Sequence, residues 1–212
     1  MKTKFYAVMH FLLTWLVRVI FLVFPKGNLR NEPRLNEGNY LVCANHLSAV
    51  DPIMICSALH RQQPRYMAKA ELFKKPVLGP MIASLGAYPV DRSGADAGVL
   101  RKTVRMLESG CSVGMFPQGT RRPDVDPAST PVRGGAGLIA ATAKVTVLPV
   151  YIKTKKNRVR WLRPVTVIVG KPMTYDEYTR GGELARDYAG ITQAIFDRIC
   201  ALGREDCPEE YK

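Results

Sequence analysis

Short runs of apolar residues alternate with longer amphipathic stretches through most of the chain. The apolar runs, rich in Val, Ile and aromatic residues, predict buried strands at 40–44, 87–90, 112–116, 145–152 and 165–169. Between them, helices are predicted at 51–60, 96–108 and 135–144. The spacing of apolar residues from Leu184 to Leu202 predicts a last amphipathic helix. Residues 69–84 are expected to be helical or irregular. Because strands alternate with helices, we expect an α/β fold with a mostly parallel central sheet flanked by helices.

The first apolar run differs from the others, because residues 5–24 match the length of a bilayer span, about 20 residues. Polar residues recur at every fourth position from Lys2 to Arg18, which gathers them on one stripe of a helix. Arg18 would be costly within a lone span, so a helix lying in the membrane interface fits better. A buried core helix is the alternative. We therefore expect a membrane-associated helix at 1–26 and one domain at 27–212.

Charge narrows the choice of partners. The chain has 31 Lys and Arg residues against 18 Asp and Glu, for a net charge of +13. From Lys171 onward there are six basic and nine acidic residues, so residues 1–170 carry +16. A body this basic predicts an anionic partner, either nucleic acid, an acidic lipid surface or a phosphorylated substrate. The five cysteines include no C-x-x-C pair and the three histidines are scattered, so neither disulfides nor a metal site is expected.

Three short motifs suggest other functions. Residues 110–114 match G-x-S-x-G, but a nucleophile elbow needs a strand before the serine and a helix after it, and here the predicted order is reversed. Residues 135–140 match a Rossmann fingerprint without the preceding strand or the following ribose-binding acid, which favours close helix packing. Residues 153–163 hold six basic residues, no acid and Trp161 between two predicted strands. This hairpin tip would suit nucleic acid or, as the apolar N-terminus favours, an anionic membrane.

His46 directly follows the predicted strand at 40–44, and Asp51 lies five residues further on. Ligands of open α/β sheets bind at the carboxyl ends of the strands, and imidazole is the side chain suited to act as a base near neutral pH. A nearby carboxylate can orient the ring, and no Ser or Cys nucleophile accompanies the pair. The pattern indicates a base acting directly on a substrate hydroxyl. The alternatives are a structural histidine and a helix N-cap.

Four short sequence motifs, which follow one another along the chain, support the interpretation that His46 acts as a base. Residues 45–51 (NHLSAVD) resemble the N-H-x4-D block of the glycerolipid acyltransferases, the family of 1-acyl-sn-glycerol-3-phosphate acyltransferases. Residues 86–92 (GAYPVDR), 116–121 (FPQGTR) and 147–150 (VLPV) are similar to its second, third and fourth blocks. The resemblance covers about residues 38–170. Gln118 departs from the pattern, since the family usually has Glu there, and leaves an amide that both donates and accepts.

The resemblance implies transfer of a fatty acyl group from a thioester to the sn-2 hydroxyl of lysophosphatidate, giving phosphatidate. In the catalytic pair, His46 would take the proton from the hydroxyl and Asp51 would orient the ring. Arg92 and Arg121 would bind the acceptor's phosphate, with Gly119 and Thr120 allowing close backbone approach. The full set of implied substrate-binding residues is Asn45, Arg92, Gln118, Gly119, Thr120 and Arg121. No cofactor or metal is implied, because acyl-CoA or acyl-carrier protein serves as co-substrate.

These expectations describe a peripheral enzyme on the cytoplasmic face of the cell membrane. Its partners would be membrane lipids, a lysophospholipid and acyl-CoA or acyl-carrier protein, with no nucleic acid. One alternative is the same chemistry on another lysolipid. The other is a protein that binds anionic lipid or nucleic acid without catalysis, whose function a His46→Ala substitution would leave intact.

Overall fold

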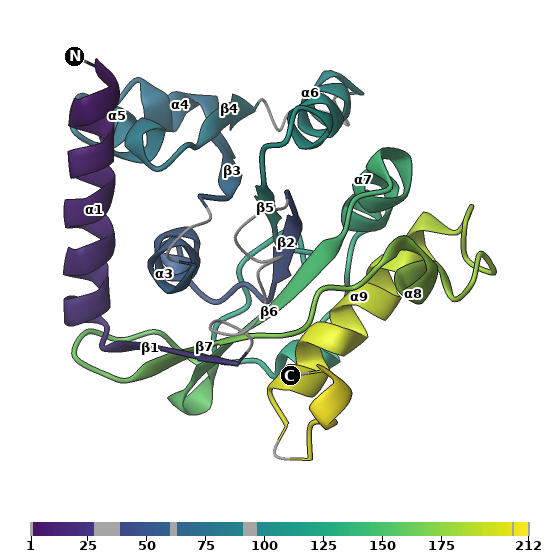
Figure 1. Ribbon diagram of the computed structural model, residues 1–212. Helices are drawn as coiled ribbons and strands as arrows, with labels where there is room; N and C mark the ends of the chain where they lie inside the picture. The colour runs from purple at the N-terminus through teal and green to yellow at the C-terminus, as the bar shows by residue number, and fades with distance from the viewer. Residues whose placement is uncertain (1, 28–38, 60–62, 91–96, 205, 212) are drawn as a thin grey trace.

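The protein is described by a computed structural model that covers residues 2–27, 39–59, 63–90, 97–204 and 206–211 (Figure 1). Within these ranges, seven strands form a single sheet in the order β1-β7-β6-β2-β5-β3-β4. All neighbouring strands are parallel except β6 and β7, which are antiparallel. The α/β class and the mostly parallel sheet are confirmed.

The strands are β1 (Val23–Gly27), β2 (Leu41–Ala44), β3 (Arg65–Lys69), β4 (Tyr88–Val90), β5 (Val113–Met115), β6 (Val147–Thr154) and β7 (Val165–Val169). The α-helices are α1 (Lys2–Ile20), α3 (Asp51–Ala58), α4 (Ala70–Phe73), α5 (Leu78–Ser84), α6 (Ala97–Glu108), α7 (Gly135–Ala143), α8 (Tyr175–Thr179) and α9 (Tyr188–Leu202). Figure 1 shows α1, α3 and α5 on one side of the sheet and α6, α7 and α9 on the other.

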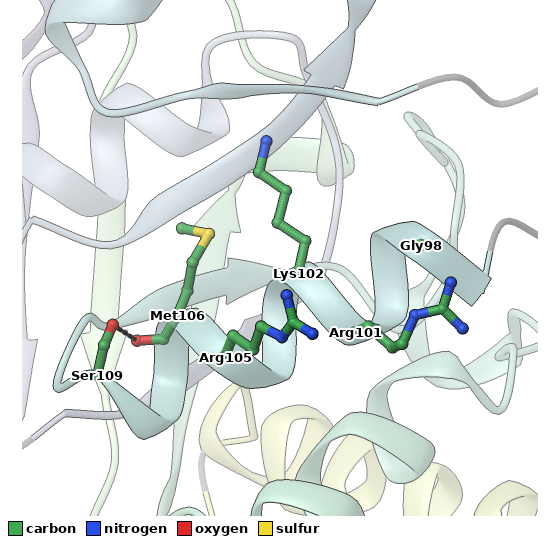
Figure 2. A pocket seen from close by; sticks show the side chains of 6 residues that line it. All are labelled: Gly98, Arg101, Lys102, Arg105, Met106 and Ser109. Atoms are coloured by element: carbon green, nitrogen blue, oxygen red, sulfur yellow. Dashed lines mark hydrogen bonds between the residues drawn. The ribbon is translucent and has the colours of Figure 1, made fainter.

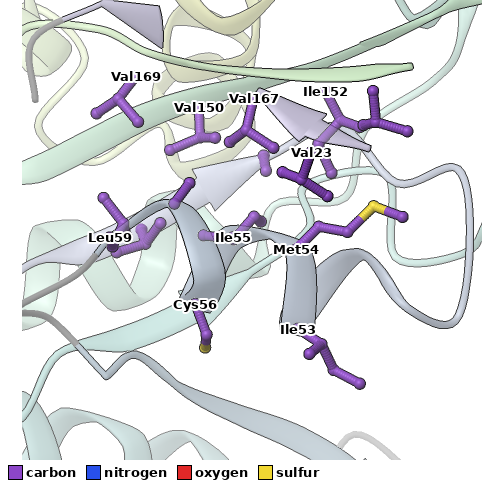
Figure 3. Packing of buried hydrophobic residues seen from close by; sticks show 14 of the residues in the cluster. Val23, Ile53, Met54, Ile55, Cys56, Leu59, Val150, Ile152, Val167 and Val169 are labelled. Atoms are coloured by element: carbon purple, nitrogen blue, oxygen red, sulfur yellow. The ribbon is translucent and has the colours of Figure 1, made fainter. Parts of the chain in front are cut away.

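Two apolar cores lie on the two faces of this sheet. Successive side chains of β2 point to opposite faces and so contribute to both cores. Val42 and Ala44 join the core beneath α1 and α3, whereas Leu41 and Cys43 join the core beneath α7 and α9. Figure 3 shows the first of these cores, where α3 packs on valines of the sheet. Because β2 is covered on both faces, its residues read as a continuous apolar run without a polar face.

Most predicted elements are confirmed to within about two residues at each end, but two strands were not foreseen. β3 carries charged residues at both ends, and only Tyr66 within it is buried, so it has no apolar run to reveal it. β1 follows a sharp turn at Leu22 and pairs with β7 along the sheet edge. The helix expected at 1–26 therefore ends at Ile20, and residues 23–26 belong to the sheet.

Helix α1 has two apolar faces. Leu13, Val17 and Ile20 pack against the core. Exposed apolar side chains three or four residues apart cover another face, namely Val8, Phe11, Leu12, Trp15, Leu16 and Val19. No helix in the described part of the chain is long and apolar enough to cross a membrane. The N-terminal run thus forms a core-packed helix that also presents an apolar stripe to its surroundings.

The structure also places the three short motifs. Ser112 lies between α6 and β5, and its buried hydroxyl accepts a hydrogen bond from the Tyr40 amide at 3.0 Å, so its setting is not a nucleophile elbow. In α7, the Gly137 amide donates to Thr192 Oγ1 of α9 at 2.8 Å, which confirms close helix packing. Residues 155–164 connect the antiparallel strands β6 and β7, as expected for a hairpin tip.

Gly137→Ala should lower the free energy of unfolding by about 1–3 kcal/mol, the usual cost of overpacking. A Cβ at this position would overlap the carbonyl oxygen of Tyr188, so α9 would have to move away from α7. Urea denaturation measures the change. Gly135→Ala is the matched control in the same helix, because a Cβ there meets no atom within 4 Å and should leave stability unchanged or slightly higher. Equal losses in both variants would contradict the packing argument.

Candidate active site

The predicted site residues gather at one edge of the sheet because four neighbouring strands run in the same direction. β2, β5, β3 and β4 are parallel neighbours, so their carboxyl ends lie at the same edge. His46 follows β2, and the segment 116–122 follows β5, which brings together two blocks that are 70 residues apart in the chain. β4 ends at Val90, whereas Arg92, expected to bind phosphate, lies outside the described residues.

His46 and Asp51 form a hydrogen-bonded pair. His46 Nδ1 lies 2.8 Å from Asp51 Oδ2, and the same oxygen accepts the backbone amides of Leu47 at 2.6 Å and Ser48 at 2.8 Å. Because that carboxylate oxygen is an acceptor, Nδ1 carries the ring proton and Nε2 is left with a lone pair. The Asp51 side chain is fully buried, while 17% of the His46 side chain is exposed. The pair therefore presents a partly exposed imidazole with a buried carboxylate hydrogen-bonded behind it, the arrangement that a general base requires.

Asp51 is the first residue of α3, but it does not cap this helix. Val50 occupies the N-cap position and has no side-chain group to cap the helix, while the Asp51 carboxylate turns back to the loop that holds His46. A negative charge in the first helical turn is favoured by the helix dipole. Asp51 Oδ1 is buried and has no hydrogen-bond partner among the described residues. A buried carboxylate left incompletely paired is costly, which favours a functional explanation over a capping one.

A stack of rings supports the imidazole. Phe116 lies parallel to His46, with ring centroids 3.9 Å apart and planes 11° apart. Tyr66 stacks on Phe116 in turn, with centroids 5.6 Å apart. Gly114 makes room for this, since a Cβ there would overlap the Tyr66 ring. Burial, with smaller contributions from nearby groups including Asp51, raises the pKa of Tyr66 well above its usual range and keeps its phenol neutral.

The backbone of His46 is held from both sides by the segment after β5. The His46 amide donates to Gln118 Oε1 at 2.7 Å, and the Arg122 amide donates to the His46 carbonyl at 2.8 Å. Gln118 is 2% exposed, and its Nε2 donates to Thr130 Oγ1 at 2.7 Å. The Thr130 hydroxyl in turn donates a hydrogen bond to the Pro127 carbonyl at 2.7 Å. This chain of hydrogen bonds fixes the backbone position of His46 and therefore the place from which its imidazole projects.

Asn45 and Gln118 were expected among the substrate-binding residues, and the structure places both behind the site instead. Asn45 is fully buried; its Oδ1 accepts from the Ile152 amide at 2.7 Å, and its Nδ2 donates to the Ile152 carbonyl at 3.1 Å. Both polar ends of each amide are therefore engaged within the protein. Buried amides paired in this way fix the end of β2 and the start of the His46 loop rather than face a ligand.

Gly119, Thr120 and Arg121 lie on an exposed turn next to Gln118. Gly119 has a φ of +67° and donates its amide to the Phe116 carbonyl at 2.9 Å, which closes the turn. The exposed Arg133 side chain lies over Gly119, where a Cβ would press on it. Arg133 has no recognisable signal in the sequence, because only the folded turn brings it to this place. A turn that collects guanidinium groups beside a base suits an anionic substrate.

Gln118→Glu, which introduces the residue usual in the resembled family, should destabilise this chain, and more so as pH rises. The Thr130 hydroxyl donates its hydrogen bond to the Pro127 carbonyl and accepts one from the Gln118 Nε2 group. In the variant, the carboxylate oxygen that replaces this NH2 group would face Thr130 Oγ1 with no hydrogen between the two oxygens. Burial and the lost hydrogen bond would raise the pKa of the new carboxyl in the folded state. The folded state would then hold more protons than the unfolded one, so stability falls as pH rises above the ordinary Glu range, by about 1–3 kcal/mol.

Urea unfolding of this variant at pH 5 and pH 8, compared with the unaltered chain, measures the effect. Gln118→Met serves as a control that also loses the hydrogen bonds but has no titratable group, so its deficit should be the same at both pH values. A Glu variant whose deficit does not change with pH would refute the proposed donor role of the Gln118 amide.

The buried thiols Cys43 and Cys56 contribute no candidate nucleophile. All five cysteines are free, and burial raises the pKa of Cys56 to about 12 and that of Cys43 still higher. A buried thiol of this kind stays protonated and unreactive near neutral pH. Within the described ranges, no group of three or more His, Cys, Asp or Glu side chains could hold a metal ion.

Two surface pockets lie apart from this constellation. A shallow one of about 540 Å³ lies along α6 (Figure 2) and is lined by Arg101, Arg105 and Lys102, whose ammonium lies over the Tyr88 ring. A narrower one of about 230 Å³ is formed by the loop between β6 and β7 together with Asp124. None of the predicted site residues lines either pocket.

Comparison with known proteins identifies the family of this chain. A 1-acyl-sn-glycerol-3-phosphate acyltransferase of Streptococcus pneumoniae is 38% identical over 113 residues, which cover 53% of this chain but only 40% of that protein. Another, from Bacillus subtilis, is 26% identical over 182 residues, 85% of this chain and 86% of that protein. The crystal structure of the 1-acyl-sn-glycerophosphate (LPA) acyltransferase PlsC from Thermotoga maritima superposes with a TM-score of 0.60 at 25% identity, covering 92% of this chain and 78% of that one. Residues 24–153, more than half of the chain and including the His46–Asp51 pair, match the Acyltransferase family model, and the chain belongs to this family.

Proposed function

We propose that this protein transfers a fatty acyl group from a thioester donor to the sn-2 hydroxyl of lysophosphatidate, giving phosphatidate. The observation that carries the proposal is the His46–Asp51 pair, whose Nε2 is left as a base beside the exposed turn at 119–121. The relatives named 1-acyl-sn-glycerol-3-phosphate acyltransferase support the choice of acceptor.

In the reaction, Nε2 of His46 takes the proton of the acceptor hydroxyl while its oxygen attacks the thioester carbonyl carbon. Asp51, hydrogen-bonded to Nδ1, keeps the ring in the required tautomer and stabilises the imidazolium that forms. When the tetrahedral intermediate collapses, the carbon–sulfur bond breaks and the leaving thiolate takes the proton back from His46. The base is thereby regenerated, and an ester and a free thiol are released.

The acceptor's phosphate provides the second anchor. Arg121 is exposed on the turn that follows Gln118, and Gly119 and Thr120 offer backbone close to it. A guanidinium group can bind two phosphate oxygens at once, which fixes the distance between the phosphate and the reacting hydroxyl. Arg133, over the same turn, and Arg92, by resemblance to the family's second block, would add to this site.

The surface of the protein supports a membrane setting for this reaction. Residues 1–170 carry an excess of 16 positive charges, and α1 exposes its apolar stripe. Amphipathic helices with this combination lie in the interface of anionic membranes. We place the enzyme on the cytoplasmic face of the cell membrane, where acyl-CoA or acyl-carrier protein can deliver the acyl chain.

Release of free thiol from acyl-CoA by the purified protein, with and without lysophosphatidate, tests the proposal. We expect acceptor-dependent release together with formation of phosphatidate acylated at sn-2. A panel of other lysolipids and an acyl-carrier-protein donor distinguishes the same chemistry on another acceptor. If no donor and acceptor pair gives acceptor-dependent release, the protein is a lipid-binding protein without this activity.

A further inference from the structure

The loop between β6 and β7 forms a small pocket rich in cations. Its volume is about 230 Å³, below the roughly 300–1,000 Å³ of sites for drug-sized ligands, so it suits a small group. The charged side chains that line it are Asp124, Lys155, Lys156, Arg158, Arg160 and Arg163. This pocket shares no lining residue with the His46 site and is not needed for the reaction proposed there.

The pocket keeps a strong positive charge after its internal pairing is counted. Asp124 contacts Arg158 as an ion pair, which neutralises the one acid among the lining residues. No carboxylate in the described ranges lies within ion-pair distance of Lys155, Lys156, Arg160 or Arg163. Four uncompensated cations around a small cavity attract a compact anion such as a phosphate.

An exposed apolar edge adjoins the cations. Trp161 is 77% exposed and Leu162 is 71% exposed, although both types of side chain normally avoid such exposure. Phe21 packs edge to face on Trp161 at 6.4 Å, and the Leu162 amide donates to the Ile20 carbonyl at 2.8 Å. The loop is thereby attached to the carboxyl end of α1, beneath which it lies in Figure 1. The exposed apolar tip of the hairpin is thus joined to the helix that carries the apolar stripe.

We infer that this pocket binds the phosphate of an anionic phospholipid in the bilayer, while Trp161 and Leu162 enter the interface beside it. A tryptophan next to cations is typical of membrane interfaces, where the ring lies at the level of the head groups and the cations meet phosphate. A nucleic acid would also satisfy the cations, but it has no use for the apolar stripe of α1. The adjoining apolar surface therefore favours lipid.

The position of the loop connects this docking to the proposed catalytic site. The Asp124 amide donates to the Asn157 carbonyl at 3.0 Å, and two residues earlier the Arg122 amide donates to the His46 carbonyl. A head group held in the pocket would therefore fix the distance between the bilayer surface and the His46 loop. This consequence rests on the proposed function, whereas lipid binding itself does not.

Vesicle flotation of the full chain tests the inference without any substrate. The probes are vesicles of phosphatidylcholine alone and of phosphatidylcholine mixed with phosphatidylglycerol. We expect preference for the anionic vesicles, and in the Arg160→Gln/Arg163→Gln variant a partition coefficient lower on the order of 30-fold, from about 1 kcal/mol per cation at the surface. Arg101→Gln/Arg105→Gln removes the same charge from the exposed surface of α6 and should change partition by less than about 3-fold by general screening alone.

Trp161 provides an independent readout, because a Trp15→Phe variant leaves it as the only tryptophan of the chain. Its emission should shift to shorter wavelength with anionic vesicles and stay unchanged with inorganic phosphate. Equal losses in both double-arginine variants, or no emission shift, would overturn the inference. So would RNA binding that depends on Arg160 and Arg163 without vesicle binding, since the pocket would then belong to nucleic acid. Circular dichroism of each variant excludes unfolding as the cause, and a failed activity assay does not affect these outcomes.

Discussion

A His46→Ala variant should lose acceptor-dependent acyl transfer, with turnover lower by about 10²- to 10⁴-fold, the usual contribution of a general base. The reason is that Nε2 of His46 has the lone pair that takes the hydroxyl proton, because Nδ1 is committed to Asp51. Thiol release from acyl-CoA in the presence of lysophosphatidate measures the loss. The KM for lysophosphatidate should change little, since in the proposed complex Arg121 and not His46 binds the phosphate.

Tyr66→Phe is the matched control for this variant. It lies in the same ring stack, two rings away from the base, and its hydroxyl is buried without a hydrogen-bond partner among the described residues. Removing an unpaired polar group should leave both activity and stability intact or slightly improved. Full turnover in His46→Ala would show that His46 is not the base of this reaction.

An Asp51→Asn variant should lose nearly as much turnover, because in triad enzymes the same change lowers kcat by roughly 10⁴-fold. An amide keeps the shape of the side chain but removes the charge that stabilises the imidazolium. Its oxygen is expected to face Nδ1, because the Leu47 and Ser48 amides donate to the same place, so the loss comes from the missing charge. Steady-state kinetics should show the loss in kcat with the KM for lysophosphatidate nearly unchanged.

Stability separates this positioning role from a purely structural one. Asp51 Oδ2 accepts the amides of Leu47 and Ser48, and an Asn side chain with its oxygen in that place keeps both hydrogen bonds, so the unfolding midpoint should fall only modestly. Thermal unfolding of Asp51→Asn beside the unaltered chain is the check. A large drop in the midpoint with a proportional loss of folded protein would assign Asp51 a structural role instead.

Much of this site was accessible from local sequence because its central pair is local. His46 and Asp51 are five residues apart, and one loop between a strand and a helix brings their side chains to 2.8 Å. The strand at 165–169 was also predicted to the residue, since a short run rich in valine between Pro164 and Gly170 has one simple interpretation. Such features depend on interactions between near neighbours in the chain.

Other roles could not be read in this way because they depend on contacts between distant segments. Gln118 was expected to meet substrate, but its environment is set by the His46 amide and by Thr130, which belong to separate loops. Asn45 likewise depends on Ile152, a residue 107 positions away. Strand β3 was missed because its place between β5 and β4 stabilises a sequence without an apolar run.

The class of fold, the His46–Asp51 pair and the basic hairpin could therefore be predicted from the amino-acid order, because each is encoded in residues close together in the chain. Which polar side chains face outward and which serve as internal supports follows only from the packing of distant segments. It also joined the tip of that hairpin to the end of α1 through Phe21 and Trp161. Burial and hydrogen-bond partners at long sequence separation are properties of the packed molecule, and no local pattern specifies them.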